Sequence, residues 1–282
     1  MRCMLQMMTP SIEPSGTEPG GAIRVYEAGP VRYTEAAPPQ ELASAVECYW
    51  TLRVDSTADD GYRHHMLPDL TIDLISVNGG RAFVMGPPTS PHRVPLAPGL
   101  YVEGARLHAA AARHVLDCAP ADLLDTKADI DDVLRAPRDF ADQLSQRSLR
   151  ELVPELLRRN AAAGDGADSI VRSAIAWLGA NSQSSIDDLS RQVSWSDRKL
   201  RRRFVDAVGM GPKLVQRIVR VQRALHQLRG RAGRISLSGL AVDCGFADQA
   251  HMTREVAHFT GLTPSRLRSL AHPSELAAPD YA

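Results

Sequence analysis

The chain has 282 residues, and its 33 lysines and arginines balance 33 aspartates and glutamates, so the formal net charge is zero. This length suits about two domains of ordinary size, and a hydrophobic content of 44% is sufficient for their cores. No stretch approaches the ~20 apolar residues that cross a bilayer, and the N-terminus lacks the apolar core of a secretory signal, so the sequence predicts a soluble protein without membrane contact.

The two ends and the cysteines give no sign of a structural framework. Residues 1–22 are predicted to be a disordered leader, in which Met7 and Met8 are alternative starts, and residues 272–282 a disordered tail. The four cysteines lie far apart without C-x-x-C spacing: Cys3, Cys48, Cys118 and Cys244. Neither a zinc ribbon nor a disulfide scaffold is predicted, and a reducing cytoplasm fits this usage.

Short runs rich in β-forming residues predict strands between about residues 25 and 107. The runs are VECYWTLRV, TIDLISV, RAFVMG and YVEGARL. Asn78-Gly79-Gly80 joins two of them and predicts a hairpin, because these residues adopt positive φ at little cost. Several strands separated by Pro/Gly turns favour a cupin-like antiparallel β-barrel or sandwich, with helices, for residues 23–160.

The hydrophobic pattern becomes helical from about Ala109, and Pro154 is expected to kink or restart the last helix before the small, polar residues 161–167. We predict a linker there and an all-helical region over residues 168–271. Ser185 and Asp188 resemble a capping box at one of its helix starts.

A single stiff helix is predicted near the middle of the all-helical region. Pro212 lies near its first turn and Gly230 at its end. At about 17 residues it would be ~25 Å long.

Charge is distributed unevenly along this neutral chain. Residues 168–271 contain 17 basic and 8 acidic residues, a net charge of +9, so the remainder carries −9. A basic region of this kind is typical of a protein that binds nucleic acid, whereas the overall net charge, taken alone, argued against such binding.

A two-helix unit occurs twice in the basic region. Leu189, Val193 and Trp195 recur 51 residues later as Leu240, Cys244 and Phe246, and Leu200, Arg202 and Phe204 recur 52 residues later as Met252, Arg254 and Val256. Each copy has a helix, a short turn through Ser194 or Gly245, and a second helix. This is the helix-turn-helix arrangement, whose second helix enters the major groove of DNA.

The region resembles the paired helix-turn-helix domain of AraC/XylS-type transcription regulators over about a hundred residues. The resemblance rests on Ser196-x-x-x-Leu200-x-Arg202-x-Phe204, the arginine-rich helix from Arg217 to Leu228, Gly245-Phe246-x-Asp248-Gln249-x-His251, Arg254, and Phe259-x-Gly261-x-Thr263-Pro264. Met252 and Val256 stand where the family usually has phenylalanine. The resemblance implies an all-α region of two helix-turn-helix units joined by a connecting helix, and hence an α+β chain.

The N-terminal part is similar to the sensing domain of a less-studied subset of these regulators, over roughly residues 30–135. The similarity rests on Tyr33, Trp50, Leu67-Pro68-Asp69, Gly86 and Gly104-x-Arg106-Leu107. The chain departs from the subset in having RLHAAA where members tend to have RF-x-PG.

Basic residues crowd the second helix of the first unit: Arg198, Lys199, Arg201, Arg202 and Arg203. The alternative interpretation is an ordinary solvated helix face. Arginine pairs well with phosphate and with guanine edges, so we predict that this face binds DNA. Arg198, Arg201 and Arg202 are expected to reach bases, and Lys199 and Arg203 to contact phosphate.

The corresponding positions of the second unit are Gln249, Ala250, His251 and Arg254. Glutamine can bind adenine, arginine guanine and alanine the thymine methyl. Asp248 would repel phosphate, so its expected role is to cap the helix. Arg217, Arg220 and Arg223 on the connecting helix are either scaffold or phosphate contacts, and the sequence leaves both open.

A metal site and catalysis are not predicted. RHHMLPD offers His64, His65 and Asp69, with His92 further on, but adjacent residues of a strand point to opposite faces, so only one of the two histidines could bind an interior metal. No catalytic triad, paired-carboxylate spacing or phosphate loop is present, so we expect neither an enzyme nor a cofactor.

Together these features predict a cytoplasmic, sequence-specific transcription regulator that binds double-stranded DNA and responds to a small-molecule effector on residues 23–160. The alternative is a ligand-independent regulator whose residues 23–160 serve only dimerisation or protein interaction. A homodimer and RNA polymerase are open as partners. The opposite charges of the two parts also raise the hypothesis that acidic side chains of the first part cover the basic cluster at residues 198–203.

Overall fold

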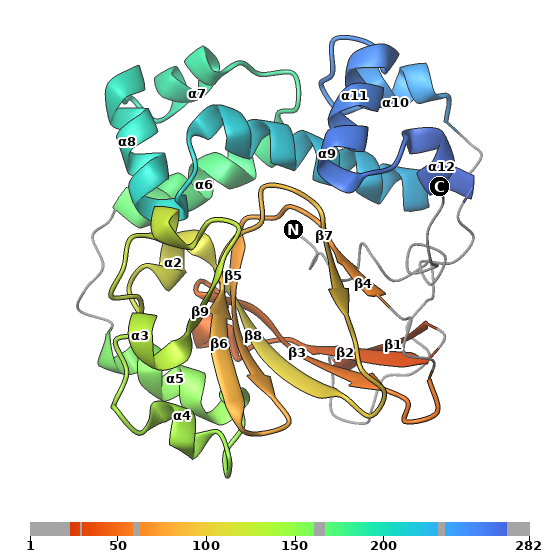
Figure 1. Cartoon of the computed structure of the whole chain (residues 1–282). Coiled ribbons are helices and arrows are strands. Elements are labelled where there is room, and N and C mark those ends of the chain that lie inside the picture. Colours follow the sequence, from red (N-terminus) through yellow and green to blue (C-terminus); the bar gives the residue numbers. More distant parts are fainter. Residues whose placement is uncertain (1–22, 29, 59–62, 161–166, 231–234, 270–282) are drawn as a thin grey trace.

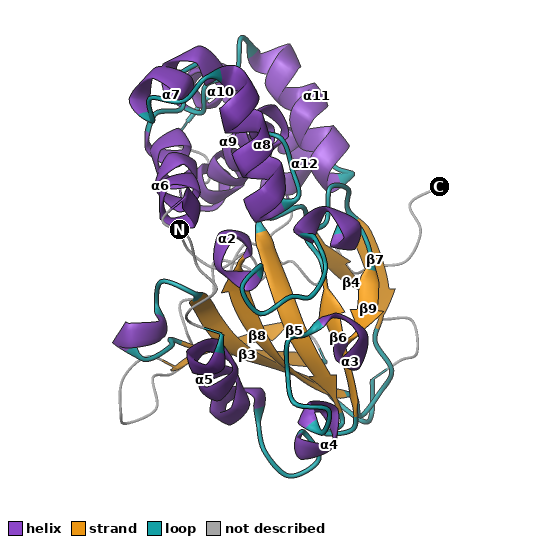
Figure 2. Ribbon diagram, turned by 90° about the vertical axis from the view of Figure 1, so that its left-hand side faces the viewer, coloured by secondary structure: helices purple, strands orange, loops and turns teal. Residues whose placement is uncertain are grey.

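The structure is a computed structural model that describes residues 23–28, 30–58, 63–160, 167–230 and 235–269. The predicted leader and tail and most of the predicted linker lie outside these residues. The chain has a strand-rich part, residues 23–160, and an all-helical part, residues 167–269. The all-helical part lies across one end of the strands (Figures 1 and 2).

Two antiparallel sheets make up the strand-rich part. The larger has the order β1 (Ile23–Ala28), β2 (Val31–Ala36), β3 (Val46–Val54), β8 (Tyr101–His108), β5 (Thr71–Val77), β6 (Arg81–Met85) and β9 (Lys127–Asp129), and the smaller pairs β4 (Arg63–Met66) with β7 (His92–Pro95). Strands β4 and β7 pair with each other instead of bridging the edges β1 and β9. Among the described residues the large sheet therefore stays open, which corrects the barrel option and leaves a sandwich-like arrangement.

The hairpin between β5 and β6 forms at the predicted turn. Asn78 and Gly79 both have positive φ, 51° and 67°, as a type I′ turn requires. Strand β5 is buried on both faces, because its two sets of side chains enter different cores. Ile72 and Leu74 belong to the core shared with the helices, and Ile75 belongs to a second core with residues of β2, β3 and β8.

The strand-rich part also contains short helices, and all of those described except η1 follow β8. They are η1 (Gln40–Leu42), α2 (Ala109–Ala112), η2 (Pro120–Leu123), α3 (Ile130–Val133), α4 (Phe140–Gln143) and α5 (Leu149–Arg159). Pro154 lies inside α5 without dividing it. The helical pattern is interrupted earlier instead, where Ser148 and Glu151 form a capping box that starts α5.

Seven helices make up the described all-helical part. They are α6 (Ala167–Ala180), α7 (Ile186–Gln192), α8 (Asp197–Val208), α9 (Pro212–Gly230), α10 (Leu237–Asp243), α11 (Gln249–Thr260) and α12 (Pro264–Ser269). Helix α9 has 19 residues, and is therefore ~28 Å long, slightly longer than predicted. The pairs α7–α8 and α10–α11 lie at opposite ends of it (Figure 1).

The two parts share one continuous hydrophobic core. It extends from residues of β5 and α2 to the C-terminal end of α8, where Ala207, Val208 and Met210 are buried. Polar contacts reinforce the docking: the Asp168 carboxylate lies 2.8 Å from His114 Nε2 and 3.1 Å from Arg113 Nε. The first helix-turn-helix unit is thus fixed to the strand-rich part through the far end of its second helix.

Gly209 lies very close to the strand-rich part at this docking. It ends α8 with φ +79°, and its repeat counterpart Gly261 ends α11 with φ +73°. A Cβ at position 209 would lie 2.8 Å from the carbonyl carbon of Pro120, whereas a Cβ at position 261 would have no neighbour within 4 Å. We expect Gly209→Ala to lower the free energy of unfolding by roughly 1 to 3 kcal/mol more than Gly261→Ala, because only the first adds steric overlap to the loss of glycine's freedom.

Urea unfolding of both full-length variants, followed by tryptophan fluorescence, measures this difference. Equal losses would show that the close approach of α8 to Pro120 contributes nothing to stability.

Candidate nucleic-acid interface

The same turn connects the two helices of each unit. Ser194 and Gly245 occupy its left-handed position, with φ 53° and 81°. The next backbone N–H bonds back to the first helix in both copies, from Trp195 to Ser190 at 3.1 Å and from Phe246 to Ala241 at 2.9 Å. Glycine is required only in the second copy, because a Cβ at Gly245 would lie 1.9 Å from the Ser182 carbonyl oxygen.

Both second helices begin at a side-chain cap. The Ser196 hydroxyl accepts the Lys199 N–H at the start of α8, and the Asp248 carboxylate accepts the His251 N–H at 2.6 Å at the start of α11. The predicted capping role of Asp248 is confirmed. These caps fix the first turn of each helix, which is the part of a recognition helix that contacts base edges.

Helix α8 buries one side and presents basic groups on the other. Leu200 and Phe204 are fully buried, as their spacing predicted. Four basic side chains are exposed: Arg198, Lys199, Arg201 and Arg202. They are exposed while the strand-rich part is docked at the other end of α8, so the hypothesis that acidic side chains of that part cover them is wrong for this arrangement.

Two members of the basic cluster also interact with the protein. The Lys199 ammonium lies over the ring of Trp195, 5.1 Å from its centre. Arg203 is half-buried. Its repeat counterpart 52 residues later, Glu255, faces the connecting helix, so this position of the unit points toward the scaffold more than toward solvent.

Helix α11 presents a smaller polar surface. Gln249, Ala250 and Arg254 are exposed, whereas His251 is half-buried. His251 Nδ1 accepts the Ala247 N–H at 3.2 Å, and its ring packs edge-on against Phe246. A neutral imidazole that accepts at Nδ1 carries its proton on Nε2, so Nε2–H is the donor that His251 can offer to another molecule.

The arginines of the connecting helix bind protein atoms. Arg217 donates to both carboxylate oxygens of Glu255, at 2.7 and 2.9 Å, and these bonds hold the pKa of Glu255 below its usual value. Arg220 donates to the carbonyls of Ser182 and Ser184, and Arg223 donates to that of Gly179 at 2.7 Å. The sequence left open whether these arginines are scaffold or phosphate contacts, and the structure favours the scaffold role.

The sequence did not single out Glu255, although this residue fixes α11 to α9. Its only signal was position: it lies directly after Arg254 and one helical turn after His251 on α11. Bidentate pairing of this kind holds the angle between two helices, because the guanidinium and carboxylate planes must align.

The histidine-rich stretch does not gather metal ligands. His65 is buried, and His92 lies 3.5 Å from Asp125. Within the described ranges, no three His, Cys, Asp or Glu side chains are grouped as a metal site would require. None of the described helices is both long and apolar enough to cross a membrane.

Two family models match the chain. Residues 189–269 match a helix-turn-helix domain, and residues 34–129 match a domain of unknown function (DUF6597). The first match covers both units and the connecting helix. The second covers strands β3 to β9 of the strand-rich part.

Curated relatives match part of the chain. The HTH-type transcriptional activator RhaR of Escherichia coli (strain K12) is 29% identical over 138 residues, which are 46% of this chain and 48% of the relative. The same protein of Shigella flexneri serotype 5b matches to the same extent. The chain thus spans about half the length of the curated relatives it matches.

Solved structures give further likenesses. An AraC-type transcriptional regulator from Chromobacterium violaceum is 25% identical, with a TM-score of 0.35, over 38% of this chain and 95% of that one. The DNA-binding domain of AdpA in complex with a target DNA is 24% identical, with a TM-score of 0.33, over 38% and 92%. ToxT from Vibrio cholerae is 10% identical, with a TM-score of 0.40, over 73% and 95%.

Proposed function

Because the chain belongs to the AraC/XylS family of transcription regulators, we propose that it binds a specific DNA sequence and thereby regulates transcription. A small-molecule effector on the strand-rich part would control this binding. The proposed role is regulatory and not catalytic, its place is the cytoplasm, and its domains are those predicted, residues 23–160 and 168–271.

The exposed basic face of α8 is the observation that carries the proposal. The side chains of Arg198, Arg201 and Arg202 lie on the solvent-exposed side of α8. The first turn of this helix is fixed by its Ser196 cap. Lys199 is better placed for phosphate, because its ammonium is held near Trp195. On α11, Gln249, Ala250 and Arg254 would contact bases and His251 would offer its Nε2–H.

The connecting helix sets the spacing of the two units. Major grooves on one face of DNA repeat every ~34 Å, whereas α9 is ~28 Å long. Binding in successive grooves therefore calls for a modest DNA bend or a tilt of the units. Arg217 holds α11 on α9, and Arg220 and Arg223 bind carbonyls of residues 179–184, which lead into α7, so we expect the DNA to adjust more than the protein.

A second role for the strand-rich part is dimerisation or protein interaction without a ligand. It would leave regulation to the abundance of the protein. RNA polymerase is a further partner that an activator would need. Sedimentation of the full chain with and without DNA distinguishes a dimer from a monomer.

Fluorescence anisotropy with a promoter fragment from the protein's own operon tests the proposal. We expect binding that prefers this fragment over a shuffled sequence, with log K falling by about 0.9 per phosphate contact for each unit of log salt. Absent or salt-insensitive binding would overturn the proposal. The matched control is Arg135→Ala, which removes an exposed arginine of the strand-rich part and should leave DNA affinity unchanged.

A further inference from the structure

A cavity lies between the two sheets of the strand-rich part. Strands β3, β5, β6 and β8 form one wall, and β4, β7 and the segment after β7 form the other. Its volume is about 160 Å³. An apolar cavity of ~150 Å³ holds one benzene molecule, so this space suits a ligand of about one aromatic ring.

The cavity wall is mostly apolar and includes aromatic and sulfur-containing side chains. Trp50 and Phe83 face it from the large sheet, Met66 faces it from the small sheet, and Met85 and Ile75 add further apolar surface. Aromatic rings and methionine offer polarisable surfaces to a flat apolar ligand.

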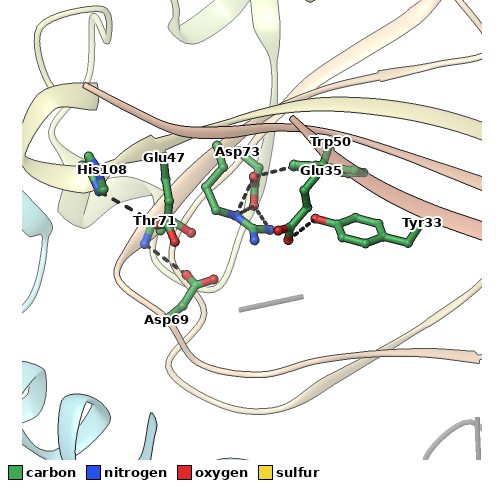
Figure 3. A network of polar contacts seen from close by, with 9 residues as sticks. Tyr33, Glu35, Glu47, Trp50, Asp69, Thr71, Asp73 and His108 are labelled. Atoms are coloured by element: carbon green, nitrogen blue, oxygen red, sulfur yellow. Dashed lines mark hydrogen bonds and ion pairs between the residues drawn. The ribbon is translucent and has the colours of Figure 1, made fainter. Parts of the chain in front are cut away.

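The two charged side chains that line the cavity, Asp73 and Arg106, have opposite signs and pair with each other. Arg106 pairs with Asp73 through Nε and Nη2, both at 3.0 Å, and the two side chains are only 3% and 7% exposed. Trp50 Nε1 donates to the same carboxylate at 2.9 Å, and Figure 3 shows Trp50 and Asp73 pointing toward each other. Because the carboxylate and the guanidinium of this pair bind each other, the lining offers a charged ligand no unpaired counter-ion.

His64 adds one polar group that is uncharged at neutral pH. It lines the cavity from β4, and burial lowers its pKa to about 4. A neutral imidazole both donates and accepts hydrogen bonds. It can therefore bind a hydroxyl or an N–H of a ligand, but it supplies no charge to a carboxylate or an ammonium.

We propose that this cavity is the effector site and that the effector is a small, uncharged, largely apolar molecule of about one ring with a single hydrogen-bonding group. This inference rests on the proposed function, because it identifies the ligand class of the regulator. A charged molecule of the same size would lose its hydration without gaining a partner, which makes its binding unfavourable.

The cavity is connected to the DNA-binding part through β4. This strand contributes His64 and Met66 to the wall and continues directly into Leu67 and Pro68. The Pro68 carbonyl accepts a hydrogen bond from Gln222 of α9 at 3.4 Å. A ligand that shifts β4 would therefore shift the segment that contacts the connecting helix.

Four probes of one ring test the ligand class on the full chain: phenol, toluene, benzoate and benzylammonium. We expect phenol and toluene to raise the melting temperature in a saturable way, phenol more than toluene, because ligands that bind only the folded state stabilise it. Benzoate and benzylammonium should have no effect. Stabilisation by either charged probe equal to that by phenol would overturn the proposal, as would stabilisation by none of the four.

Variants that fill the cavity test whether phenol binds at this site and not elsewhere on the protein. Val94→Phe on β7 and Ile75→Phe on β5 both add a ring to the wall, and either should weaken phenol binding by about tenfold or more in calorimetry. The matched control is Val242→Phe, which adds the same atoms at an exposed position of α10 and should bind phenol like the parent. Unchanged phenol binding by both filled variants, if folded, would overturn the assignment.

DNA binding measured on the same samples distinguishes failure of the cavity assignment from failure of the proposed function. If the promoter fragment binds but no uncharged probe does, the proposed function stands and the cavity assignment fails. If phenol binds the parent but shifts DNA affinity in no direction, the cavity is not the effector site and the proposal is likewise overturned.

Discussion

Replacing Arg202 and Arg254 together with alanine is expected to abolish the preference of the protein for its own promoter site. The two arginines occupy equivalent exposed positions in the two units. Each bidentate contact with a guanine is worth about 1 to 3 kcal/mol of discrimination. The units lie at opposite ends of α9, so the two losses should add to about 2 to 6 kcal/mol. Competition anisotropy against a shuffled fragment measures the preference directly.

Lys199→Ala serves as the contrasting variant. It removes a predicted phosphate contact, so affinity should fall for all sequences alike and the salt slope should flatten by about one unit. A fold check by circular dichroism accompanies every variant. If the double arginine variant loses melting temperature yet keeps the site preference of the folded protein, the two arginines are structural and the assignment is wrong.

Asp73→Ala is expected to destabilise the strand-rich part more than any surface change. It removes the carboxylate that Arg106 binds through Nε and Nη2 at a site only 3% exposed, and it removes the acceptor for Trp50 Nε1. Breaking a buried pair on one side typically costs about 3 to 5 kcal/mol, because a charge remains in a poorly hydrated place. Urea unfolding followed by circular dichroism gives the change in free energy.

An exposed ion pair of the same composition is the control. Asp117 pairs with Arg135 at 2.7 Å, with exposed fractions of 59% and 43%, and Asp117→Ala should cost about 0 to 1 kcal/mol. Changing Asp73→Leu and Arg106→Met together should be milder than Asp73→Ala, since both members of the ion pair are then removed. If Asp73→Ala cost no more than Asp117→Ala, the buried pair would not stabilise the fold.

Features set by a few neighbouring residues were predictable from the sequence. The hairpin at Asn78-Gly79, the capping box at Ser185 and the cap at Asp248 depend on local backbone conformation and on side chains three residues apart. The repeat was equally visible, because the same buried pattern occurs twice at fixed spacing. These are short-range signals, and the sequence states them directly.

Features that depend on distant segments were not predictable. Whether Arg217 contacts DNA or protein depends on Glu255, which lies 38 residues away in the chain. The large sheet does not close into a barrel because β4 pairs with β7. No property of the edge strands alone determines this. Reduced exposure of Arg203 and His251 likewise follows from packing between helices, which a pattern of charges does not reveal.

The close approach of α8 to Pro120 has a consequence for building chimeric regulators. A graft that joins residues 168–282 to the sensor of another protein would lose the surface that receives Gly209 and the buried end of α8. The donor sensor would have to supply a turn of the same shape as the one at Pro120, whose backbone lies close to Gly209. Exchanges made inside the strand-rich part, with η2 and α2 retained, keep this joint intact and are therefore the more promising route to a new ligand response.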